Sequence, residues 1–308
     1  MKHAFLIIAY KHVSLLTQLI EQLDHPDSSF FIHIDKKSPL IEDPSAQALK
    51  SRSNVYFAKE RIDMHWAGFS HVRATLQLLE SALSGTDATY CHLLSGQCFP
   101  IRSMVTFLQF FEENNGRNFM DYFSIPDPRW GESGGRDRLT YYHLHDVLNS
   151  KGRYFDLLDR KFTSVQKLLN IKRRYPKSFP SLYGGGTWWS LHRDFLEYFL
   201  SYIEENPVFY KRFQHSFCPD EFLFQTVLMD SPFKDTAVNN NLRFIDWSGK
   251  GSSPPDLDET YLEQLMTGEH LFARKFDPLR SERLIQRIKA EMLESSIGGA
   301  RSSGVLLG

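Results

Sequence analysis

The stretch FLIIAY, residues 5–10, decides the fold class because it is a short run of apolar residues without a polar face. Such a run predicts a buried strand. Apolar residues at helical spacing follow over 13–23, and a second strand, FFIHID, is predicted at 30–35. Strand, helix and strand in this order indicate a parallel βαβ unit. We therefore expect an α/β protein with a parallel central sheet.

The same alternation continues along the chain, with one interruption. Strands are predicted at 54–58 and 89–94, and helices at 72–83 and from 105 to 111. The segment 121–182 is less regular, and we expect loops and helices over the sheet there. After it, the pattern predicts strands at 187–191 and 242–247 and helices at 194–205, at 220–229 and from about 281.

Composition narrows the class of protein. The 308 residues carry a net charge of −1, with 42% hydrophobic and 14% aromatic residues, which is typical of a folded globular chain. A near-neutral charge gives no reason to expect nucleic-acid binding. Three cysteines predict no disulfide framework and favour a reducing compartment. The N-terminal run is interpreted as a strand rather than a signal peptide, and no apolar run reaches the length of a membrane span.

Ligand candidates follow from the predicted sheet, because ligands of such sheets bind at the carboxyl ends of strands. Those ends carry Tyr10 and His12, then Asp35, then Ser95 with Gln97. The sequence lacks a Walker loop, a Gly-x-Gly-x-x-Gly after the first strand and a Gly-x-Ser-x-Gly elbow. Ser95 is therefore interpreted as part of a loop rather than as a nucleophile.

The stretch from Ser216 to Glu221 is the most chemically suggestive. Two adjacent acids, Asp220 and Glu221, open a predicted helix, where the helix dipole lowers the pKa of a carboxyl group. An ionised carboxylate that faces a cleft can serve as a general base for a sugar hydroxyl. Plain matching of the acids to the helix dipole is the alternative, and it stays open at this point.

Other residues are candidates for binding a diphosphate or a metal ion. Arg274 and Lys275 lie between aromatic residues and could neutralise a diphosphate, and Arg243 could join them. The only Asp-x-Asp pair, Asp256 and Asp258, follows two prolines and is interpreted as a helix start. His143 and His145 merely alternate, so no metal site is predicted.

Seven motifs in order resemble glycosyltransferase family 14, the core-2/I-branching β-1,6-N-acetylglucosaminyltransferases and peptide O-xylosyltransferases. The resemblance spans about residues 4–277. Its motifs are IIAYKH at 7–12, FIHIDKKS at 31–38, WAGFS at 66–70, LLSGQCFPI at 93–101, GTWWSL at 186–191, FCPDE at 217–221 and HLFARKFD at 270–277. Gln97 stands where the family usually has Asp.

The resemblance implies a GT-A-like fold with a Rossmann-like central sheet and transfer without a metal or other cofactor. It implies that Glu221 is the base and that Lys275 neutralises the donor diphosphate, with Arg243 the best match for a second cation. The remaining contacts that it implies are Tyr10, His12, Asp35, Trp66 and Ser95 for the donor, and Glu132, Arg136, Arg138, Trp188, Trp189 and Asp220 for the acceptor.

We therefore predict an inverting, metal-independent transferase of N-acetylglucosamine or xylose, with a UDP-sugar donor and a glycan or lipid-linked glycan acceptor. A cytoplasmic bacterial enzyme of surface glycan synthesis is expected, with possible peripheral membrane contact. We expect one catalytic domain over 1–280, in which 121–182 forms the acceptor side, and then a helix and frayed tail over 281–308. The alternatives are a non-catalytic nucleotide- or glycan-binding module, a metal-dependent transferase that uses Asp256 and Asp258, and a glycoside hydrolase, which is disfavoured because no second acid has a matching context.

Overall fold

A seven-stranded sheet forms the centre of the computed structural model, which describes residues 1–147, 153–249 and 253–293. The strand order is β10-β6-β9-β4-β1-β2-β3. In that order the strands are Ala237–Asn239, Asn118–Met120, Trp189–His192, Tyr90–Ser95, His3–Ala9, Ser28–Ile34 and Val55–Phe57.

The predicted α/β class is confirmed, with one difference in strand direction. Neighbouring strands β4, β1, β2 and β3 are parallel, and so are β6 and β10. Strand β9 runs antiparallel to both β4 and β6. It enters the sheet after the long segment 121–182, so no single crossover helix constrains its direction.

Two smaller sheets lie beside the main one. β11 (Arg243–Ile245) pairs parallel with β12 (Phe272–Arg274), which pairs antiparallel with β5 (Phe99–Pro100). The third sheet joins β7 (Phe123–Ser124) to β8 (Tyr183–Gly184).

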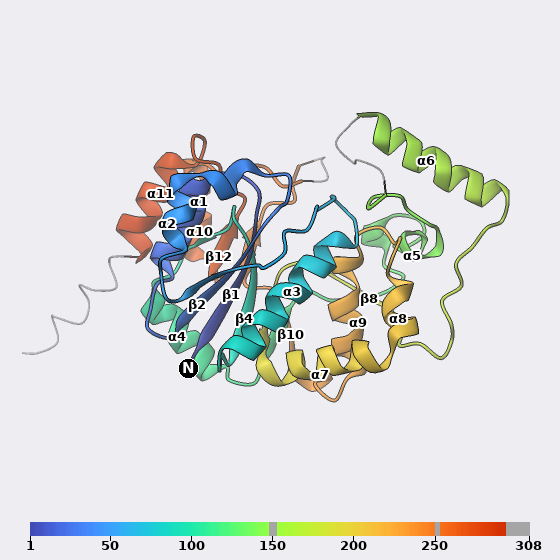
Figure 1. The fold of residues 1–308 in the computed structure, drawn as a ribbon, viewed down its shortest axis with the longest axis horizontal. Helices are drawn as coiled ribbons and strands as arrows, with labels where there is room; N and C mark the ends of the chain where they lie inside the picture. Colours follow the sequence, from blue (N-terminus) through green and yellow to red (C-terminus); the bar gives the residue numbers. More distant parts are fainter. Residues whose placement is uncertain (148–152, 250–252, 294–308) are drawn as a thin grey trace, which may run out of the picture.

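Helices cover both faces of the main sheet, as an alternating β-α sequence requires (Figure 1). One face packs against residues of α3 and α7 to α9, and the other against residues of α1, α2 and α4. Their bounds are Val13–Gln22 for α1, Pro44–Leu49 for α2, Ser70–Gly85 for α3, Met104–Glu113 for α4, Arg193–Glu205 for α7, Pro207–Arg212 for α8 and Leu223–Asp230 for α9.

A third apolar cluster joins the C-terminal helices to the small β5-β12 sheet. Helices α10 (Leu262–Thr267) and α11 (Glu282–Ile288) pack there against Phe99 and Phe276. The predicted helix after residue 281 is thus confirmed. The frayed tail predicted at the C-terminus falls on residues 294–308, which lie outside the described residues.

The segment 121–182 contains helices as well as loops, as expected. It includes the short α5 (Asp137–Thr140) and the long α6 (Arg153–Leu168). Figure 1 shows α6 at the outer edge of the molecule, well away from the central sheet. The expectation that this segment lies over the sheet is therefore wrong for α6, whose inner side is held by residues 142–145 instead.

Candidate active site

Glu221 lies in a three-residue 3₁₀ turn, Pro219–Glu221, directly before α9. Cys218 precedes the turn with a left-handed backbone (φ 48°), a conformation that non-glycine residues seldom adopt outside special sites. The Cys218 N–H donates to the carbonyl of Ala67 at 2.9 Å, and the Gly185 N–H donates to the carbonyl of Glu221 at 3.0 Å. The acid is thus fixed by backbone hydrogen bonds on both sides.

The carboxyl group of Glu221 is paired with Arg138 of α5. Arg138 Nη1 donates to Glu221 Oε2 at 2.6 Å, and both side chains remain partly exposed. The Arg138 guanidinium stacks over the ring of Trp130 at 3.9 Å, which fixes its direction. Burial and the neighbouring Asp220 raise the pKa of Glu221 to about 7, and Arg138 opposes that rise.

This finding corrects the sequence prediction that a helix dipole lowers the pKa of Glu221. The acids open a turn of only three residues, and α9 begins two residues after Glu221. Burial in a protein disfavours the ionised carboxylate, and here it outweighs the attraction of Arg138. A carboxylate with a pKa near neutrality is well matched to proton transfer at physiological pH.

Asp220 faces a different group of side chains. Its Oδ2 accepts a hydrogen bond from Thr187 Oγ1 at 2.8 Å and lies 3.7 Å from His71 Nδ1. The His71 ring meets the ring of Trp188 edge-on, with 6.0 Å between centroids. Burial lowers the pKa of His71, so this imidazole is neutral near pH 7.

Asp220, His71 and Trp188 thus form a row of side chains. Arg274 extends this row toward the ends of the parallel strands. Its guanidinium lies 4.5 Å from the centroid of the Trp188 ring, and its charge interacts with Tyr10, beside the end of β1. Within the described part of the chain, Arg274 forms no ion pair with a carboxylate, which leaves its charge available for an anionic ligand. The neighbouring Lys275 is partly exposed, with Nζ 3.7 Å from Asp256 Oδ1.

Arg243 does not belong to this row, and its contact with the donor diphosphate stays a prediction. It is only 3% exposed, and it donates to Ser190 Oγ at 2.8 Å and to the Trp189 carbonyl at 2.7 Å. Burial lowers the pKa of Arg243 to about 9. These hydrogen bonds fix its guanidinium in the centre of the sheet. Its Nε has no hydrogen-bond partner among the described residues, and Arg243 lines the second cavity described below.

The acceptor contact predicted for Trp189 is wrong, because Trp189 is fully buried in the core beside Phe224. A side chain without exposed surface offers nothing to an acceptor. Trp188 is also largely buried, yet it lies between His71 and Arg274, so its acceptor contact stays a prediction.

The residues predicted for the donor gather at the carboxyl ends of β1, β2 and β4. The Tyr10 hydroxyl donates to Gln97 Oε1 at 3.2 Å, and Gln97 Nε2 donates to the Phe276 carbonyl at 3.0 Å. An Asp at position 97 has no donor for that second bond, so Gln97 ties the end of β1 to the residues after β12. His12 Nε2 lies 3.5 Å from Asp277 Oδ2 in the same region.

Asp35 and Ser95 complete this edge, each with local hydrogen bonds. Asp35 Oδ1 accepts from the N–H of Lys37 at 3.0 Å, and Ser95 Oγ accepts from the N–H of Gln97 at 3.2 Å. Ser95 thus holds a turn, as predicted for a loop. Trp66 is 52% exposed and meets the Phe217 ring edge-on at 5.5 Å.

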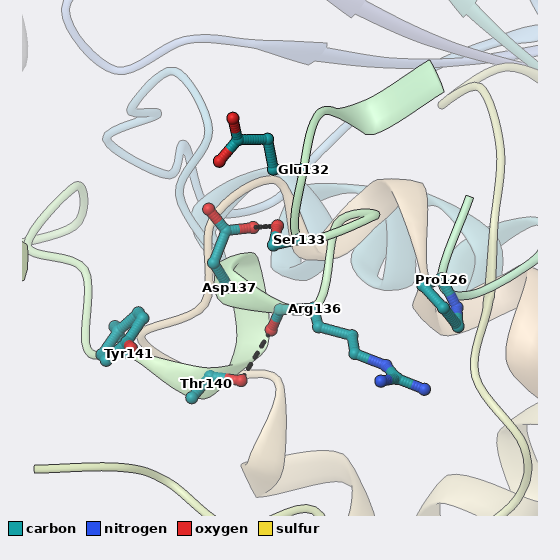
Figure 2. Close-up of a pocket in the computed structure, with 7 residues that line it drawn as sticks. All are labelled: Pro126, Glu132, Ser133, Arg136, Asp137, Thr140 and Tyr141. Carbon is teal, nitrogen blue, oxygen red and sulfur yellow. Dashed lines mark hydrogen bonds between the residues drawn. The ribbon is translucent and has the colours of Figure 1, made fainter. Parts of the chain in front are cut away.

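A cavity of about 340 Å³ lies beside the Arg138 segment (Figure 2). Glu132 and Arg136, both predicted as acceptor contacts, line it. Figure 2 shows the Arg136 guanidinium extending away from Glu132 and Asp137. The other lining residues are Pro126, Ser133, Asp137, Thr140 and Tyr141.

A second cavity, of about 290 Å³, was missed by the sequence analysis. Asp121, Asn241 and the exposed Trp247 line it, among other residues. Carboxylate, amide and indole groups together suit sugar hydroxyls and an apolar sugar face. Gly185 and Gly186 separate Asp121 from the Glu221 turn, and a Cβ on Gly185 would lie 1.9 Å from the Asp121 carbonyl oxygen. The signal that could have found this site is the run of asparagines that follows β10.

The Asp-x-Asp pair of the metal-dependent alternative has other partners in the structure. Asp258 accepts from the Thr260 N–H at 3.0 Å as the cap of a 3₁₀ turn, which confirms the prediction of a helix start, and Asp256 faces Lys275. Among the described residues, the group with metal-ligand types is His143, His145 and Asp159, of which the sequence prediction considered only the two histidines. The second ring nitrogens of both histidines lack partners there, whereas histidine ligands usually donate that N–H. We interpret this cluster as packing that holds α6.

The fold and the site define an α/β protein in which the candidate ligand-binding residues lie at the carboxyl ends of the parallel strands, with Glu221 beside them. The model of the Core-2/I-Branching enzyme family matches residues 3–270, so the chain belongs to this family, as the motifs indicated.

The chain is 27% identical to xylosyltransferase 1 of Rattus norvegicus, over 92% of this chain and 35% of that protein. It is also 27% identical to xylosyltransferase 1 of Homo sapiens, over 92% of this chain and 30% of that protein. The chain thus spans about a third of the length of these relatives. Among solved structures, the galactosyltransferase LgtC with donor and acceptor sugar analogs aligns with a TM-score of 0.40 at 13% identity, covering 97% of this chain and 99% of that one.

Proposed function

We propose that this chain is an inverting, metal-independent glycosyltransferase that moves N-acetylglucosamine or xylose from a UDP-sugar to a hydroxyl of a glycan acceptor. The observation that carries the proposal is Glu221, fixed by its backbone, paired with Arg138 and raised in pKa to about 7. Family membership supports sugar transfer, and the names of the xylosyltransferase relatives support xylose as one donor sugar.

The proposed step needs one base and a stabilised leaving group. Glu221 takes the proton of the acceptor hydroxyl while its oxygen attacks the anomeric carbon from the face opposite the diphosphate. The bond from that carbon to the diphosphate oxygen breaks, and UDP leaves with the electron pair. Arg274 and Lys275 stabilise the developing negative charge by donating to the diphosphate. Arg274 takes the role first predicted for Arg243.

The uridine is proposed to lie at the ends of β1 and β2. Asp35 can accept from a ribose hydroxyl or from the imide of the base, and Tyr10, half exposed, offers an aromatic face. The acceptor is proposed to lie on the Arg138 side, where Glu132 and Arg136 line the cavity beside α5. Asp121 and Asn241 of the second cavity are proposed to contact sugar hydroxyls.

The pH dependence of kcat/KM follows from the ionisation of Glu221, the proposed base. Glu221 acts only when ionised, so kcat/KM should rise with pH and level off above the pKa of about 7. Arg138 lowers this pKa, so Arg138→Gln should move the rising limb to higher pH. Initial rates between pH 5 and 9 test this, and an unmoved limb in a folded Arg138→Gln protein contradicts it.

Arg274, the cation proposed to bind the donor diphosphate, gives a separate prediction. Arg274→Met keeps an apolar contact with Trp188 but removes the charge, so the Kd for UDP should rise at least about tenfold. Calorimetric titration with UDP measures this, with Arg280→Met, an exposed arginine, as the matched control. Equal UDP affinity in both variants would remove Arg274 from the donor site.

The test of the proposed function is transfer in the presence of EDTA. UDP-N-acetylglucosamine and UDP-xylose are incubated with simple glycoside acceptors, and the product is examined by NMR. The proposal predicts transfer that survives EDTA and a product of inverted anomeric configuration. Loss of transfer that Mn²⁺ restores would favour the metal-dependent alternative, and retained configuration would exclude a single displacement.

The remaining alternatives predict other outcomes. A binding module on the same fold would bind UDP without turnover. A glycoside hydrolase would release free sugar and would not need a nucleotide donor; it requires a pair of carboxyl groups across the bond. Asp220 is engaged with Thr187 and lies near His71, which does not favour that second role.

The place of action is proposed to be the cytoplasm, at the inner face of the cell membrane, where a lipid-linked glycan would be the acceptor. All three cysteines are free and buried, which suits a reducing compartment. No helix in the described ranges has the length and apolar character of a membrane span. Fractionation of cells that express the tagged chain tests this, and recovery from an oxidising compartment would overturn it.

A further inference from the structure

Helix α6 turns one face inward, and that face is fixed by polar contacts. Asp159 accepts from the Leu144 N–H at 3.1 Å and lies 3.0 Å from His143 Nδ1. Gln166 Oε1 accepts from the Tyr142 N–H at 2.8 Å, and its Nε2 donates back to the Tyr142 carbonyl at 2.9 Å. These contacts set the rotation of the helix, so the opposite face is directed outward.

The outward face carries large apolar side chains. Leu168 is 85% exposed, and Leu157, Leu158 and Val165 are each at least half exposed. At about 100° per residue these four lie within an arc of about 100°, opposite the buried Asp159 and Gln166. Leu169 and Ile171 extend the exposed apolar surface beyond the end of the helix. We call the exposed apolar residues of 157–171 the α6 outer face.

The charges in and after α6 are mainly positive. From the start of α6 at residue 153 to residue 177 the chain has eight cations and two acids, Asp156 and the buried Asp159. Lys161 lies within the apolar arc, and Arg160 and Lys167 flank it. The exposed cations are Arg160, Lys161, Lys167, Lys172, Arg174 and Lys177. A second copy of this face would bring like charges together, whereas an anionic surface would neutralise them.

We propose that the α6 outer face binds the surface of an anionic lipid bilayer, with its leucines inserted at the headgroup boundary and its cations on the lipid phosphates. Leucine and valine on one side with flanking lysine and arginine is the pattern of a helix that lies in the membrane interface. Figure 1 shows α6 at the outer edge of the molecule, where a flat surface can reach it without meeting the sheet.

The geometry also connects this surface to the candidate active site. Arg138, which contacts Glu221, and Tyr142, which holds α6, are four residues apart in sequence, and the cavity residues Thr140 and Tyr141 lie between them. A bilayer on α6 would therefore lie on the side where an acceptor attached to a lipid could approach. Bilayer binding itself does not require the proposed sugar transfer, so each can fail without the other.

The experiment is sedimentation of the full chain with vesicles of phosphatidylcholine alone or with 30% phosphatidylglycerol. Binding should require the anionic lipid and weaken with added salt. Lys161→Gln, Lys167→Gln and Lys172→Gln together should lower the partition coefficient on the order of 100-fold. Leu157→Gln, Leu168→Gln and Leu169→Gln together should lower it by a similar factor.

Matched controls distinguish vesicle binding by the α6 outer face from nonspecific association with lipid. Leu279→Gln, at 86% exposure in the turn before α11, and the triple change of Lys50, Lys59 and Lys234 to Gln should leave vesicle binding unchanged. Failure of the wild type to bind anionic vesicles overturns the proposal, and so does equal binding to neutral vesicles. A dimer in sedimentation velocity that Leu168→Gln dissociates would also overturn it, in favour of a second copy on this face.

Discussion

Glu221→Gln should lower kcat by at least about 10²-fold while the affinity for UDP stays within about twofold. The amide retains the shape of the side chain but cannot take the proton of an acceptor hydroxyl, and a positioned base typically contributes 10² to 10⁴-fold. UDP is proposed to bind at the strand ends and at Arg274, which the substitution does not touch. Initial rates with saturating donor and acceptor measure the loss.

The control for this prediction is Glu112→Gln, which makes the same change on an exposed acid of α4. It should leave kcat unchanged. If Glu221→Gln keeps kcat within a factor of ten, Glu221 is not the base. If UDP affinity falls together with kcat, Glu221 contributes to the donor site instead.

Arg243→Met should lower the free energy of unfolding by at least about 3 kcal/mol. The substitution leaves the Trp189 carbonyl and the Ser190 hydroxyl without their buried donor, and each buried polar group left unpaired costs about 1 to 3 kcal/mol. Hydrogen bonds that involve a charged donor are at the upper end of that range. Urea denaturation of the wild type and the variant measures the change.

The same experiment distinguishes Arg243 from Arg274. Arg274→Met should remain close to the wild type in stability while it weakens UDP binding, because its guanidinium contacts the Trp188 ring and has no carboxylate partner in the described part of the chain. If Arg243→Met is as stable as the wild type and loses UDP affinity, the role first predicted for Arg243 is correct after all.

Much of the sheet could be predicted because the local sequence pattern of each strand is sufficient to identify it. FLIIAY and FFIHID are buried apolar runs, and each occurs as a strand within two residues of the predicted start. The direction of β9 could not be predicted, because it depends on where a segment of about sixty residues returns to the sheet. Helices were expected within 121–182, but the outward direction of the exposed apolar residues of α6 could not be predicted. An apolar stripe has the same period in sequence whichever way it faces.

The candidate site was predictable in its position along the chain but not in its electrostatics. Motif order assigned Glu221 and Lys275 to one family pattern, and the family model matches residues 3–270. The roles of both residues stay predictions. Whether an arginine is buried against carbonyls, as Arg243 is, or stacked on an indole, as Arg274 is, depends on tertiary contacts that a sequence does not show. The pKa of Glu221 likewise depends on burial, which overrides the dipole argument made from sequence.

The most direct test of the central claim is donor binding in the absence of metal. Thermal unfolding is measured in EDTA with UDP and a panel of UDP-sugars at millimolar concentration. A ligand at about 100 times its Kd adds about 2.7 kcal/mol of stability, which shifts the unfolding temperature measurably. The account predicts stabilisation by UDP and by one UDP-sugar, equal with and without EDTA. Absence of any UDP-dependent shift would contradict it, because a chain that cannot hold the donor cannot transfer its sugar.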